Sequence, residues 1–483
     1  MFCRSLFTHH NCWTTVVNHL RKVPNSRCNR TATAAAALLC PSSSSCQACI
    51  NANNIQHLSS TTNNMADIKP AERISGMGPS VWVEFTKLAS DTKAINLGQG
   101  FPDFAAPEHV VKGLSDVLQS SNPLTHQYTR GFGHPRLVNA IAALYSKHMS
   151  HEINPMNEVL VSVGAYGSLF YIFMGLVSPG DEVIIIEPFF DCYEPMTRMA
   201  GGTPRFIALK PKNENVTSTK DFVLDPEELA GMFNEKTKAI IVNNPNNPLG
   251  KVFNREELEM IANLCKKHNV LCVSDEVYEY MVYEGQKQIR MATLPDMWER
   301  TITVCSAGKI FSVTGWKLGW AIAPNHLLNS LMLVHQNCVY TCSTVLQEAV
   351  AVSLEKEMAL LGKPECYLTS LAEELNGKRD KMADLLRDIN LTPIIPDGGY
   401  FIMTDISHLD VDVEKYGEGR KDFKFVRWMT KELGVATIPC SAFYGEEHKA
   451  LGERYIRFCF IKENSTMEKA AERLKKWTEE RHA

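Results

Sequence analysis

TITVCSAGKIFSVTGWKLGW, residues Thr301–Trp320, joins an apolar run to a stretch that holds two lysines, Lys309 and Lys317, among small and aromatic residues. Its first part, Thr301–Cys305, is typical of a buried β-strand. No Asp or Glu occurs in the stretch, although lysine rarely lies unpaired in apolar surroundings. We therefore expect the partners of these lysines to come from other parts of the chain.

Four other short apolar runs predict further strands. Because they are near-continuous in Val and Ile instead of alternating, they suit strands that are covered on both faces. Helical patterns separate them: Asn254–Asn269, for example, has Asn at its start, Glu in its first turn and Lys and His in its last. This alternation predicts an α/β fold with a mainly parallel sheet. The four runs are Val159–Val163, Glu182–Pro188, Lys238–Asn244 and Val270–Asp275.

Changes in composition divide the chain into four predicted segments. Residues 1–66 form a targeting or disordered segment, and 67–104 form an N-terminal arm that joins a small domain. Residues 105–350 form the large α/β domain. Residues 351–483 form a small C-terminal α+β domain, because a long charged helical pattern, Leu368–Ile389, is followed there by short strands.

The overall composition excludes several classes of protein. The net charge is −4 and no basic stripe occurs, which argues against nucleic acid as a partner. No apolar run reaches the roughly 18 residues of a membrane-spanning helix. Most cysteines after residue 50 are single and lie in apolar runs, as in a reduced intracellular protein. The pair Cys46 and Cys49 lacks a second pair at zinc spacing, so no metal site is predicted.

The first 66 residues contain no Asp or Glu and are rich in Ser, Thr and Ala, with interspersed Arg. This composition predicts a mitochondrial transit peptide within about residues 1–64. The alternative is a disordered, low-complexity tail. Met65 opens a segment that resembles a second start, which predicts a possible cytosolic form as well.

The residues that follow the predicted strands form a candidate site, because open α/β sheets bind ligands at the carboxyl ends of their strands. The set offers small residues at a helix start, which suit an anion, together with aromatic rings, amides, a carboxylate, a phenol and an amine. Each has a simpler explanation alone: a helix start, a helix N-cap for Asp275, core packing for Phe190, turn chemistry for the Asn and Pro residues. The residues are Gly164, Ala165, Tyr166, Phe190, Asn243, Asn247, Asp275, Tyr278, Ser306 and Lys309.

Together these groups match the needs of pyridoxal 5′-phosphate, which requires a lysine to hold its aldehyde as a Schiff base and a carboxylate to keep its ring nitrogen protonated. Lys309 is the predicted lysine and Asp275 the predicted carboxylate. Phe190 would stack on the ring. Ser306, Lys317 and the backbone at Gly164 and Ala165 would hold the phosphate, and Asn247 and Tyr278 would donate to the ring oxygen.

Three motifs, NNPNNPLGKVF (Asn243–Phe253), SDEVYEYMVYEG (Ser274–Gly285) and SAGKIFSVTGWKLGW (Ser306–Trp320), resemble those of class I/II pyridoxal-phosphate aminotransferases of fold type I. The resemblance runs from about Ile74 to the C-terminus. It implies a large domain with a mainly parallel sheet of the seven-stranded type, flanked by helices, and a smaller α+β domain. VWVEFTKLA, NLGQGFPDF, HQYTRGFGHPRL and EPFFDCYEPM look most like kynurenine aminotransferases, also called glutamine transaminase K or cysteine-S-conjugate β-lyase.

The resemblance also implies roles for residues that the strand ends do not single out. Arg457 matches the arginine that grips the substrate α-carboxylate, a task that suits a planar bidentate side chain; without the resemblance, a surface charge at a strand edge would be preferred. Asn243 matches an amide near the cofactor ring. Tyr128 matches a tyrosine that reaches the cofactor phosphate of a neighbouring subunit, which implies a homodimer with shared sites. Trp82, Gly100 and Asn247 match the substrate pocket.

The implied reaction is transamination of kynurenine, glutamine and aromatic or sulfur amino acids with a 2-oxo acid, with cysteine-conjugate β-lyase as a side activity. An aspartate- or alanine-type preference is the alternative, although no segment marks a second arginine for a distal carboxylate. Thr341 stands where the mammalian relatives have histidine, which leaves fine specificity open.

Two other classes of protein share single features with this sequence. Ser306–Lys309 has the S-x-x-K spacing of a serine acyl-enzyme, but K-T-G is absent. A regulator that senses pyridoxal phosphate would need a helix-turn-helix pattern, and the first 66 residues show none.

Overall fold

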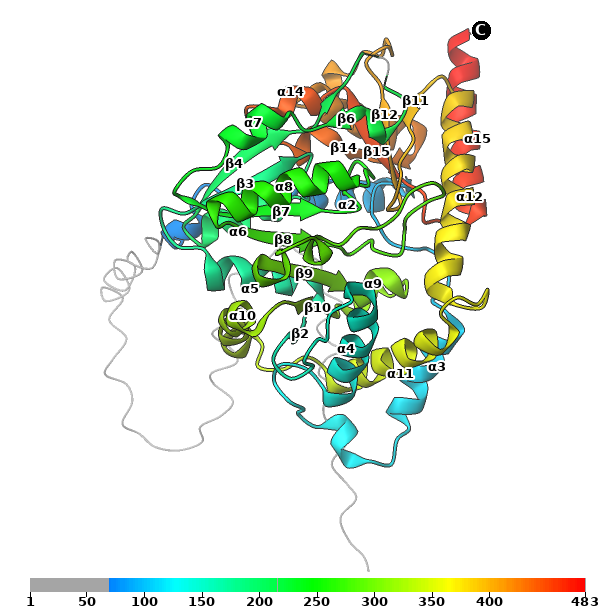
Figure 1. The fold of residues 1–483 in the computed structure, drawn as a ribbon. Coiled ribbons are helices and arrows are strands. Elements are labelled where there is room, and N and C mark those ends of the chain that lie inside the picture. Colours follow the sequence, from blue (N-terminus) through cyan, green and yellow to red (C-terminus); the bar gives the residue numbers. More distant parts are fainter. Residues whose placement is uncertain (1–68, 215, 483) are drawn as a thin grey trace, which may run out of the picture. The chain divides into compact units, whose positions relative to one another are not determined.

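The computed structural model describes residues 69–214 and 216–482, and the fold below is that of Ala71–Ala483, which form one compact unit. Its centre is a seven-stranded sheet in which the strand order is β2-β10-β9-β8-β7-β3-β4 (Figure 1). Strand β10 is antiparallel to both neighbours, and the other strands are parallel to one another. The strands are β2 Val159–Ser162, β3 Glu182–Glu187, β4 Thr203–Ala208, β7 Thr237–Asn243, β8 Leu271–Asp275, β9 Thr301–Ser306 and β10 Gly319–Ile322.

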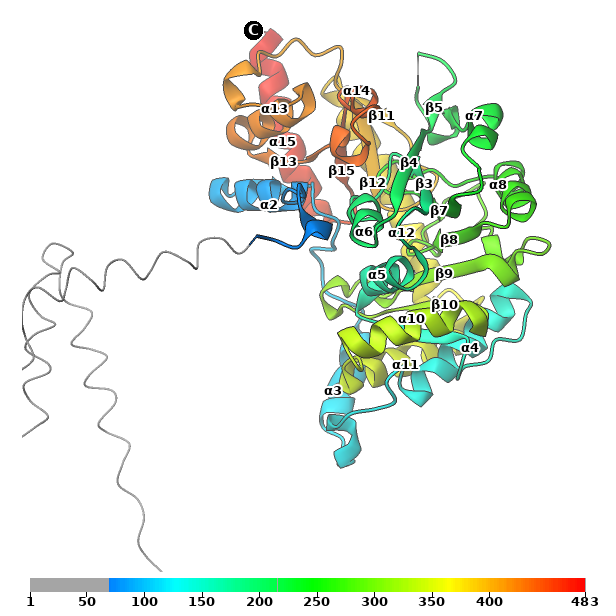
Figure 2. The same cartoon turned by 90° about the vertical axis from the view of Figure 1, so that its left-hand side faces the viewer.

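Helices cover both faces of this sheet, which explains its near-continuous apolar strands. Along β3, Val183 and Ile185 pack with α5 and α10, whereas Ile184 and Ile186 pack with α8 on the opposite face. Figure 2 shows α5 and α6 on one side of the strands and α8 on the other. The helices of this part are α3 Glu108–Leu118, α4 Pro135–Met149, α5 Gly164–Leu176, α6 Tyr193–Met199, α7 Pro226–Gly231, α8 Arg255–His268, α9 Ala307–Ile310, α10 Asn325–Cys338 and α11 Thr344–Leu360.

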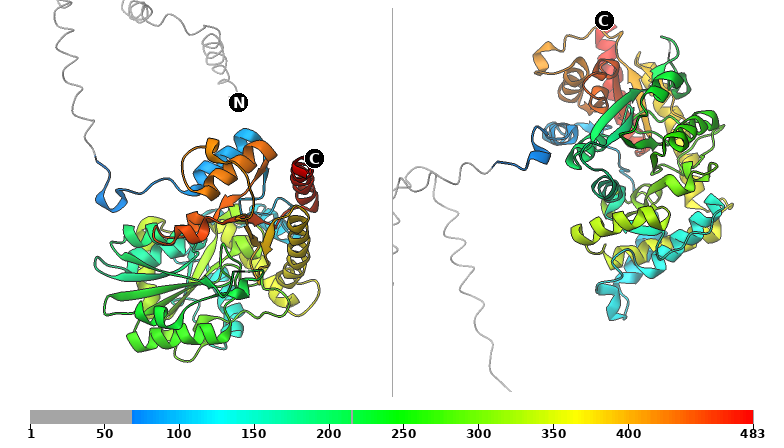
Figure 3. Two further views of the ribbon diagram at one scale, coloured as in Figure 1. Left: turned by 90° about the horizontal axis from the view of Figure 1, so that it is seen from above. Right: turned by 60° about the vertical axis from the view of Figure 1, so that its left-hand side comes forward.

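A second, four-stranded sheet has the order β11-β12-β15-β14, so β15 is an interior strand. The short strand β1 pairs with β13, which joins the segment after residue 80 to the C-terminal part of the chain. Helix α2 also packs against the C-terminal part of the chain, and Figure 3 shows it beside α13. The ring centres of Phe85 on α2 and Phe423 on α13 lie 5.7 Å apart. The elements are α2 Val81–Thr92, β1 Ile95–Asn96, α12 Tyr367–Asp388, β11 Thr392–Ile394, β12 Phe401–Asp405, α13 Lys421–Trp428, β13 Val435–Ala436, β14 Ile438–Pro439, α14 Lys449–Gly452, β15 Tyr455–Cys459 and α15 Asn464–His482. A further small pair is β5 Lys210–Pro211 with β6 Phe222–Val223.

The predicted α/β fold with a mainly parallel sheet is confirmed, and each predicted strand is present within one residue at either end. Helix α8 begins after a capping box between Asn254 and Glu257, as its sequence indicates. The other two strands of the large sheet, β4 and β10, were not predicted from the sequence. The domain boundaries stay predictions; the one at residue 350 falls inside α11. The predicted targeting segment and Cys46 and Cys49 lie outside the described residues.

Candidate active site

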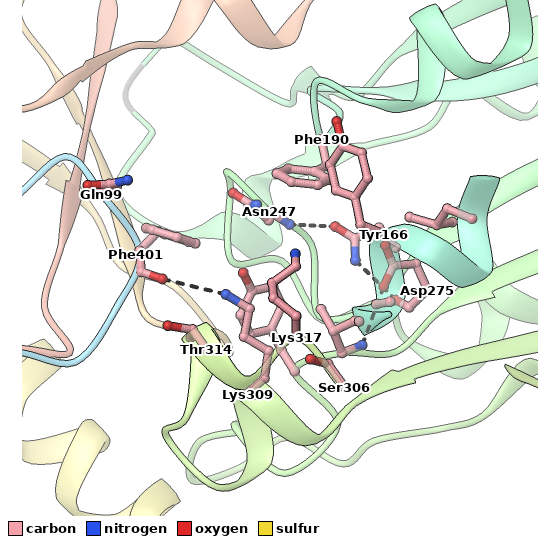
Figure 4. A pocket seen from close by; sticks show the side chains of 18 of the residues that line it. Gln99, Tyr166, Phe190, Asn247, Asp275, Ser306, Lys309, Thr314, Lys317 and Phe401 are labelled. Atoms are coloured by element: carbon pink, nitrogen blue, oxygen red, sulfur yellow. Dashed lines mark hydrogen bonds between the residues drawn. The ribbon is translucent and has the colours of Figure 1, made fainter. Parts of the chain in front are cut away.

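The carboxyl ends of β2, β3, β7, β8 and β9 meet at one edge of the large sheet, where a cavity of about 250 Å³ opens (Figure 4). All the predicted site residues except Tyr128 line it. They are Trp82, Gly100, Gly164, Ala165, Tyr166, Phe190, Asn243, Asn247, Asp275, Tyr278, Ser306, Lys309, Lys317 and Arg457. The other lining residues are Gln99, Leu169, Val277, Gly308, Thr314, Leu318 and Phe401.

Lys309 lies on α9, the short helix that directly follows β9. Its Nζ donates to the hydroxyl oxygen of Tyr400 at 2.5 Å and lies 3.5 Å from the carbonyl oxygen of Gly100. Burial lowers the pKa of Lys309 to about 8, and the positive charges of Arg457 and Lys317 act in the same direction. The amine is therefore neutral in part of the population near neutral pH, as a nucleophile or proton acceptor must be.

Asp275 ends β8 and is almost fully buried. The hydroxyl of Tyr193 donates to its Oδ2 at 2.6 Å, and the backbone N–H of Val277 lies 3.4 Å from Oδ1. A turn follows Asp275, so the alternative of a helix N-cap is wrong. Burial raises the pKa of Asp275 to about 6. Among the described residues, no Lys, Arg or His forms an ion pair with this carboxylate, which leaves it suited to a cationic ligand.

Small residues and hydroxyl and amine groups meet at the N-terminus of α5. Gly164 begins this helix with a φ of 69°, a conformation that favours glycine. A Cβ at Gly164 would lie 3.5 Å from Lys317 Nζ, so the amine sits beside the free backbone N–H groups of the helix start. Ser306 precedes α9 without using its hydroxyl as a cap. These groups form an anion cradle of the kind that a phosphate needs.

Aromatic rings border the cavity between the cradle and Asp275. The rings of Tyr166 and Phe190 lie 6.1 Å apart in an edge-on arrangement, and Phe190 makes a similar contact with Tyr193. Tyr278 also lines the cavity and is buried, with Lys309 Nζ 5.5 Å from the centre of its ring.

A chain of hydrogen bonds connects Asp275 to Arg457 on the other sheet. Asn243 Nδ2 donates to the carbonyl oxygen of Asp275, and Asn243 Oδ1 accepts from the backbone N–H of Asn247 at 2.7 Å. Arg457 then donates to Asn247 Oδ1 at 2.7 Å and to the carbonyl oxygen of Gly98 at 2.9 Å. The amides of the NNPNNPLG turn therefore place an arginine relative to Asp275.

Arg457 is fully buried on the interior strand β15, so its interpretation as an edge-strand surface charge is wrong. Its guanidinium lies 3.7 Å from the ring centre of Phe401 and 5.1 Å from those of Trp82 and Phe443. Its Nε has no hydrogen-bond partner among the described residues. A buried, aromatic-walled guanidinium with free donor capacity is suited to a ligand carboxylate.

Tyr128 lies outside this cavity. Its side chain is 83% exposed and packs edge-on against Tyr340, which is 55% exposed, with ring centres 5.6 Å apart. Thr341 follows Tyr340 in the connection between α10 and α11. The role predicted for Tyr128 in a neighbouring subunit stays a prediction.

Two tyrosines of the site were not predicted from the sequence, Tyr193 and Tyr400. Tyr193 is the first residue of α6, and its hydroxyl donates to Asp275. Tyr400 directly precedes β12 of the second sheet, and its hydroxyl oxygen accepts from Lys309. Tyr193 follows the carboxyl end of β3 in the same segment as Phe190, but the sequence did not indicate its contact with Asp275. Tyr400 follows no strand of the large sheet, so strand ends could not indicate it.

The described residues contain no group of three or more His, Cys, Asp or Glu side chains that could hold a metal ion. None of the helices within residues 69–482 is long and apolar enough to span a membrane.

Comparison with known proteins gives a consistent result. The family model for aminotransferase class I and II matches residues 92–474. Kynurenine–oxoglutarate transaminase 3 of Homo sapiens is 54% identical over 411 residues, which cover 84% of this chain and 90% of that protein. Kynurenine–oxoglutarate transaminase 1 of Homo sapiens is 48% identical over 419 residues, or 86% of this chain and 99% of that protein.

A solved structure, that of Bna3p from Saccharomyces cerevisiae, superimposes with a TM-score of 0.79 at 34% identity and covers 85% of this chain and 99% of its own. The fold, the motifs and the family model agree, and the acyl-enzyme and regulator alternatives are wrong. The chain belongs to the class I and II aminotransferase family.

Proposed function

We propose that this aminotransferase uses pyridoxal 5′-phosphate to transfer the amino group of kynurenine to a 2-oxo acid. The observation that carries the proposal is a single cavity lined by an anion cradle, a buried carboxylate without an ion-pair partner, an amine with a lowered pKa and an arginine surrounded by aromatic rings. The relatives named above are kynurenine–oxoglutarate transaminases, and their high identity over most of this chain supports the same donor.

The lining residues fit the cofactor group by group. The N-terminus of α5, Ser306 and Lys317 would hold the phosphate, Asp275 would pair with the ring nitrogen and Lys309 would hold the aldehyde carbon. When bound, pyridoxal phosphate supplies an electron sink that acidifies the α-hydrogen of the amino acid. Asp275 fits this task because it is buried and forms no ion pair with a described Lys, Arg or His, and the protonated ring nitrogen would provide one.

Lys309 and Arg457 carry out the steps that belong to the protein. Arg457 binds the α-carboxylate of the amino acid in an aromatic cage that excludes water and strengthens the charge pair. Lys309 Nζ, once free, would take the proton from the substrate α-carbon as a general base and then, as a general acid, deliver it to the carbon that held the aldehyde of the cofactor. Its pKa of about 8 allows both directions near neutral pH.

The walls of the cavity favour aromatic and uncharged donors. Trp82, Tyr166, Phe190 and Phe401 line it, and Arg457 is the one arginine among the described lining residues. A distal carboxylate, as in aspartate, would lie among these rings without a dedicated cation, which is unfavourable. Glutamine and the sulfur amino acids extend the proposed donors, and release of pyruvate from a cysteine S-conjugate would be a side activity at the same site.

A panel of donors tests this specificity. Kynurenine, glutamine, phenylalanine, methionine and aspartate are each assayed with 2-oxoglutarate, pyruvate and phenylpyruvate as acceptors. We expect kcat/KM for kynurenine and glutamine to exceed kcat/KM for aspartate at least about tenfold, because one polar group that the site accommodates poorly lowers kcat/KM by this order. A high rate with aspartate and weak rates with the other donors would establish an aspartate-type enzyme. Pyruvate formation from a cysteine S-conjugate without added acceptor measures the β-lyase reaction.

Cofactor affinity should depend on pH through Asp275. Below about pH 6 the carboxylate of the cofactor-free protein is protonated and cannot pair with a cation, so affinity should fall as pH decreases through this value. Asp275→Asn should weaken binding roughly 10- to 100-fold at pH 7.5 and remove the pH step. Titration of the cofactor-free protein with pyridoxal phosphate, followed by absorbance, measures both effects. Asp116→Asn, at an exposed position on α3, is the control, and a pH step that survives Asp275→Asn would exclude this role.

A homodimer with shared sites is part of the proposal. The exposed Tyr128 and Tyr340 support it, because large aromatic side chains outside a core commonly mark contact surfaces. Mixing inactive Tyr128→Ala with inactive Lys309→Ala subunits should restore activity through the hybrid dimer, which has one site with both native residues. Monomeric behaviour in sedimentation would contradict this arrangement.

We also propose a mitochondrial location for the form that begins at Met1, with a cytosolic form from Met65. The acid-free composition of residues 1–66 supports it. Cell fractionation with N-terminal sequencing tests it, and a cytosolic protein that retains Met1 would refute the transit peptide.

A further inference from the structure

Tyr400 is a buried tyrosine whose hydroxyl group contacts the reactive amine of Lys309. Its hydroxyl oxygen accepts from Lys309 Nζ at 2.5 Å, and its O–H donates to the carbonyl oxygen of Gly100 at 2.9 Å. Lys309 Nζ also lies 3.5 Å from that carbonyl oxygen. The phenol therefore connects the amine to the loop that borders the predicted substrate pocket.

The surroundings of Tyr400 fix the position of its ring. The ring packs edge-on against Tyr278 at 5.1 Å and against Phe401 at 4.7 Å, and its own carbonyl oxygen accepts from the backbone N–H of Phe460. A Cβ at Gly100 would lie 3.0 Å from Tyr400 Cε2 and 2.5 Å from Phe401 Cζ, so the backbone of Gly100 approaches the rings as closely as glycine allows. The hydroxyl oxygen cannot move far from Lys309.

We propose that Tyr400 is a positioning residue for Lys309: its hydroxyl oxygen accepts a hydrogen bond from the Nζ amine whenever that amine is not bonded to the cofactor, and holds it on the Gly100 side of the cavity, where the substrate α-carbon must lie. The inference rests on the role of Lys309 in the proposed function and adds a partner that none of the sequence motifs indicated.

The chemistry of the contact follows from the single hydrogen of the phenol. Because that hydrogen goes to the carbonyl oxygen of Gly100, the lone pairs of the hydroxyl oxygen face Lys309. Burial raises the pKa of Tyr400 well above its ordinary value, so the phenol stays neutral and keeps its proton. Lys309 alone gains the proton from the substrate α-carbon and loses it again, and Tyr400 stabilises the ammonium form between the two transfers.

This role predicts a change in the pKa of Lys309 that does not depend on turnover. In Tyr400→Phe the ammonium form loses its acceptor, so the pKa of Lys309 in the cofactor-free protein should fall by about one pH unit below that of the native protein. Competitive acetylation of the cofactor-free protein across pH 6 to 11, with the Lys309 peptide quantified by mass spectrometry, measures this value. In the holoenzyme, kcat should fall roughly tenfold while KM for the amino donor stays within about twofold.

Tyr283→Phe is the matched control. Tyr283 is also buried and donates its hydroxyl hydrogen to the carbonyl oxygen of Gly399, next to Tyr400, but it does not contact Lys309. Tyr283→Phe removes one buried hydroxyl group, as Tyr400→Phe does, but leaves the contacts of Lys309 unchanged. The pKa of Lys309 in Tyr283→Phe should therefore equal that in the native protein. Equal pKa values for Lys309 in the native, Tyr400→Phe and Tyr283→Phe proteins would overturn the inference.

If Tyr400→Phe does not fold, replacement of Tyr400 by 3-fluorotyrosine keeps the experiment decisive. Fluorination makes the hydroxyl oxygen a weaker acceptor at nearly constant shape, so the pKa of Lys309 should fall in the same direction by a smaller amount, and an unchanged pKa refutes the contact. An active Lys309→Ala enzyme would refute the proposed function itself. An inactive Lys309→Ala enzyme combined with an unchanged pKa in the Tyr400 variants would refute only the inference about Tyr400.

Discussion

Lys309→Ala lowers the rate of transamination at least roughly 10³- to 10⁴-fold, because it removes both the amine that holds the cofactor and the group that moves the proton. Steady-state assays with kynurenine and 2-oxoglutarate measure the loss, and the absorbance band of the cofactor bonded to lysine disappears with it. The magnitude follows from the position of Lys309. It lies in the cavity, and burial lowers its pKa to about 8.

Lys317→Ala is the informative comparison, since both lysines come from the same short stretch between β9 and β10. Lys317 lies beside the start of α5, so its loss should weaken the hold on the phosphate and leave the proton transfer intact. Activity should therefore return in excess pyridoxal phosphate for Lys317→Ala and not for Lys309→Ala. Equal rescue of the two variants would show that their tasks are not separate, and normal activity of Lys309→Ala would end the assignment.

The difference between the two lysines shows what could be predicted from the sequence. Lys309, Asp275 and Asn247 each follow an apolar run, and the carboxyl ends of parallel strands must meet at one edge, so their proximity could be anticipated without coordinates. The path of the chain between Lys309 and Lys317 could not. Strand β10 has only four residues, and its antiparallel pairing places Gly319 between Ser306 and Ser162, which brings Lys317 back to the start of α5.

Residues that do not follow a strand of the large sheet could not be assigned to the site from the ends of its strands. Arg457 lies in the middle of β15, and its sequence suggests a surface charge until the second sheet is seen to place it at the interior position beside Phe401. Tyr400 contacts Lys309, which lies 91 residues earlier in the sequence. Such contacts are decided by packing of the whole fold, and short-range patterns carry no signal for them.

A buried cluster of ion pairs involves Glu276, the residue that follows Asp275. Arg290 Nη1 pairs with Glu276 Oε2 and Arg290 Nη2 with Glu279 Oε2, both at 2.5 Å, and all three side chains are less than a tenth exposed. The hydroxyl of Tyr145 donates to Glu279 Oε1 at 2.5 Å. One arginine thus neutralises two carboxylates on the turn that follows β8, the turn that also carries Tyr278. None of the side chains of this cluster lines the cavity, and we expect the cluster to hold the turn, and with it Asp275, in place.

Arg290→Met should destabilise the protein by about 3–5 kcal/mol at pH 7.5, because it leaves two buried carboxylates without their partner. Urea unfolding of the cofactor-free protein, monitored by circular dichroism, measures the change. Burial already raises the pKa of Glu276, and loss of Arg290 raises it further above the value in the unfolded chain. Proton uptake by the folded variant should therefore relieve the penalty as pH falls from 7.5 toward 5.

Two further variants separate this effect from a general loss of charge. Arg198→Met removes an exposed pair with Glu194 on α6 and should change stability by less than about 1 kcal/mol at either pH. Adding Glu276→Gln and Glu279→Gln to Arg290→Met removes the buried charges and should restore part of the lost stability. If Arg290→Met were no more destabilising than Arg198→Met, or if its penalty grew at low pH, the cluster would not be the support of Asp275. Because the turn positions that carboxylate, the expected loss of stability is accompanied by weaker binding of pyridoxal phosphate to whatever fraction of Arg290→Met remains folded.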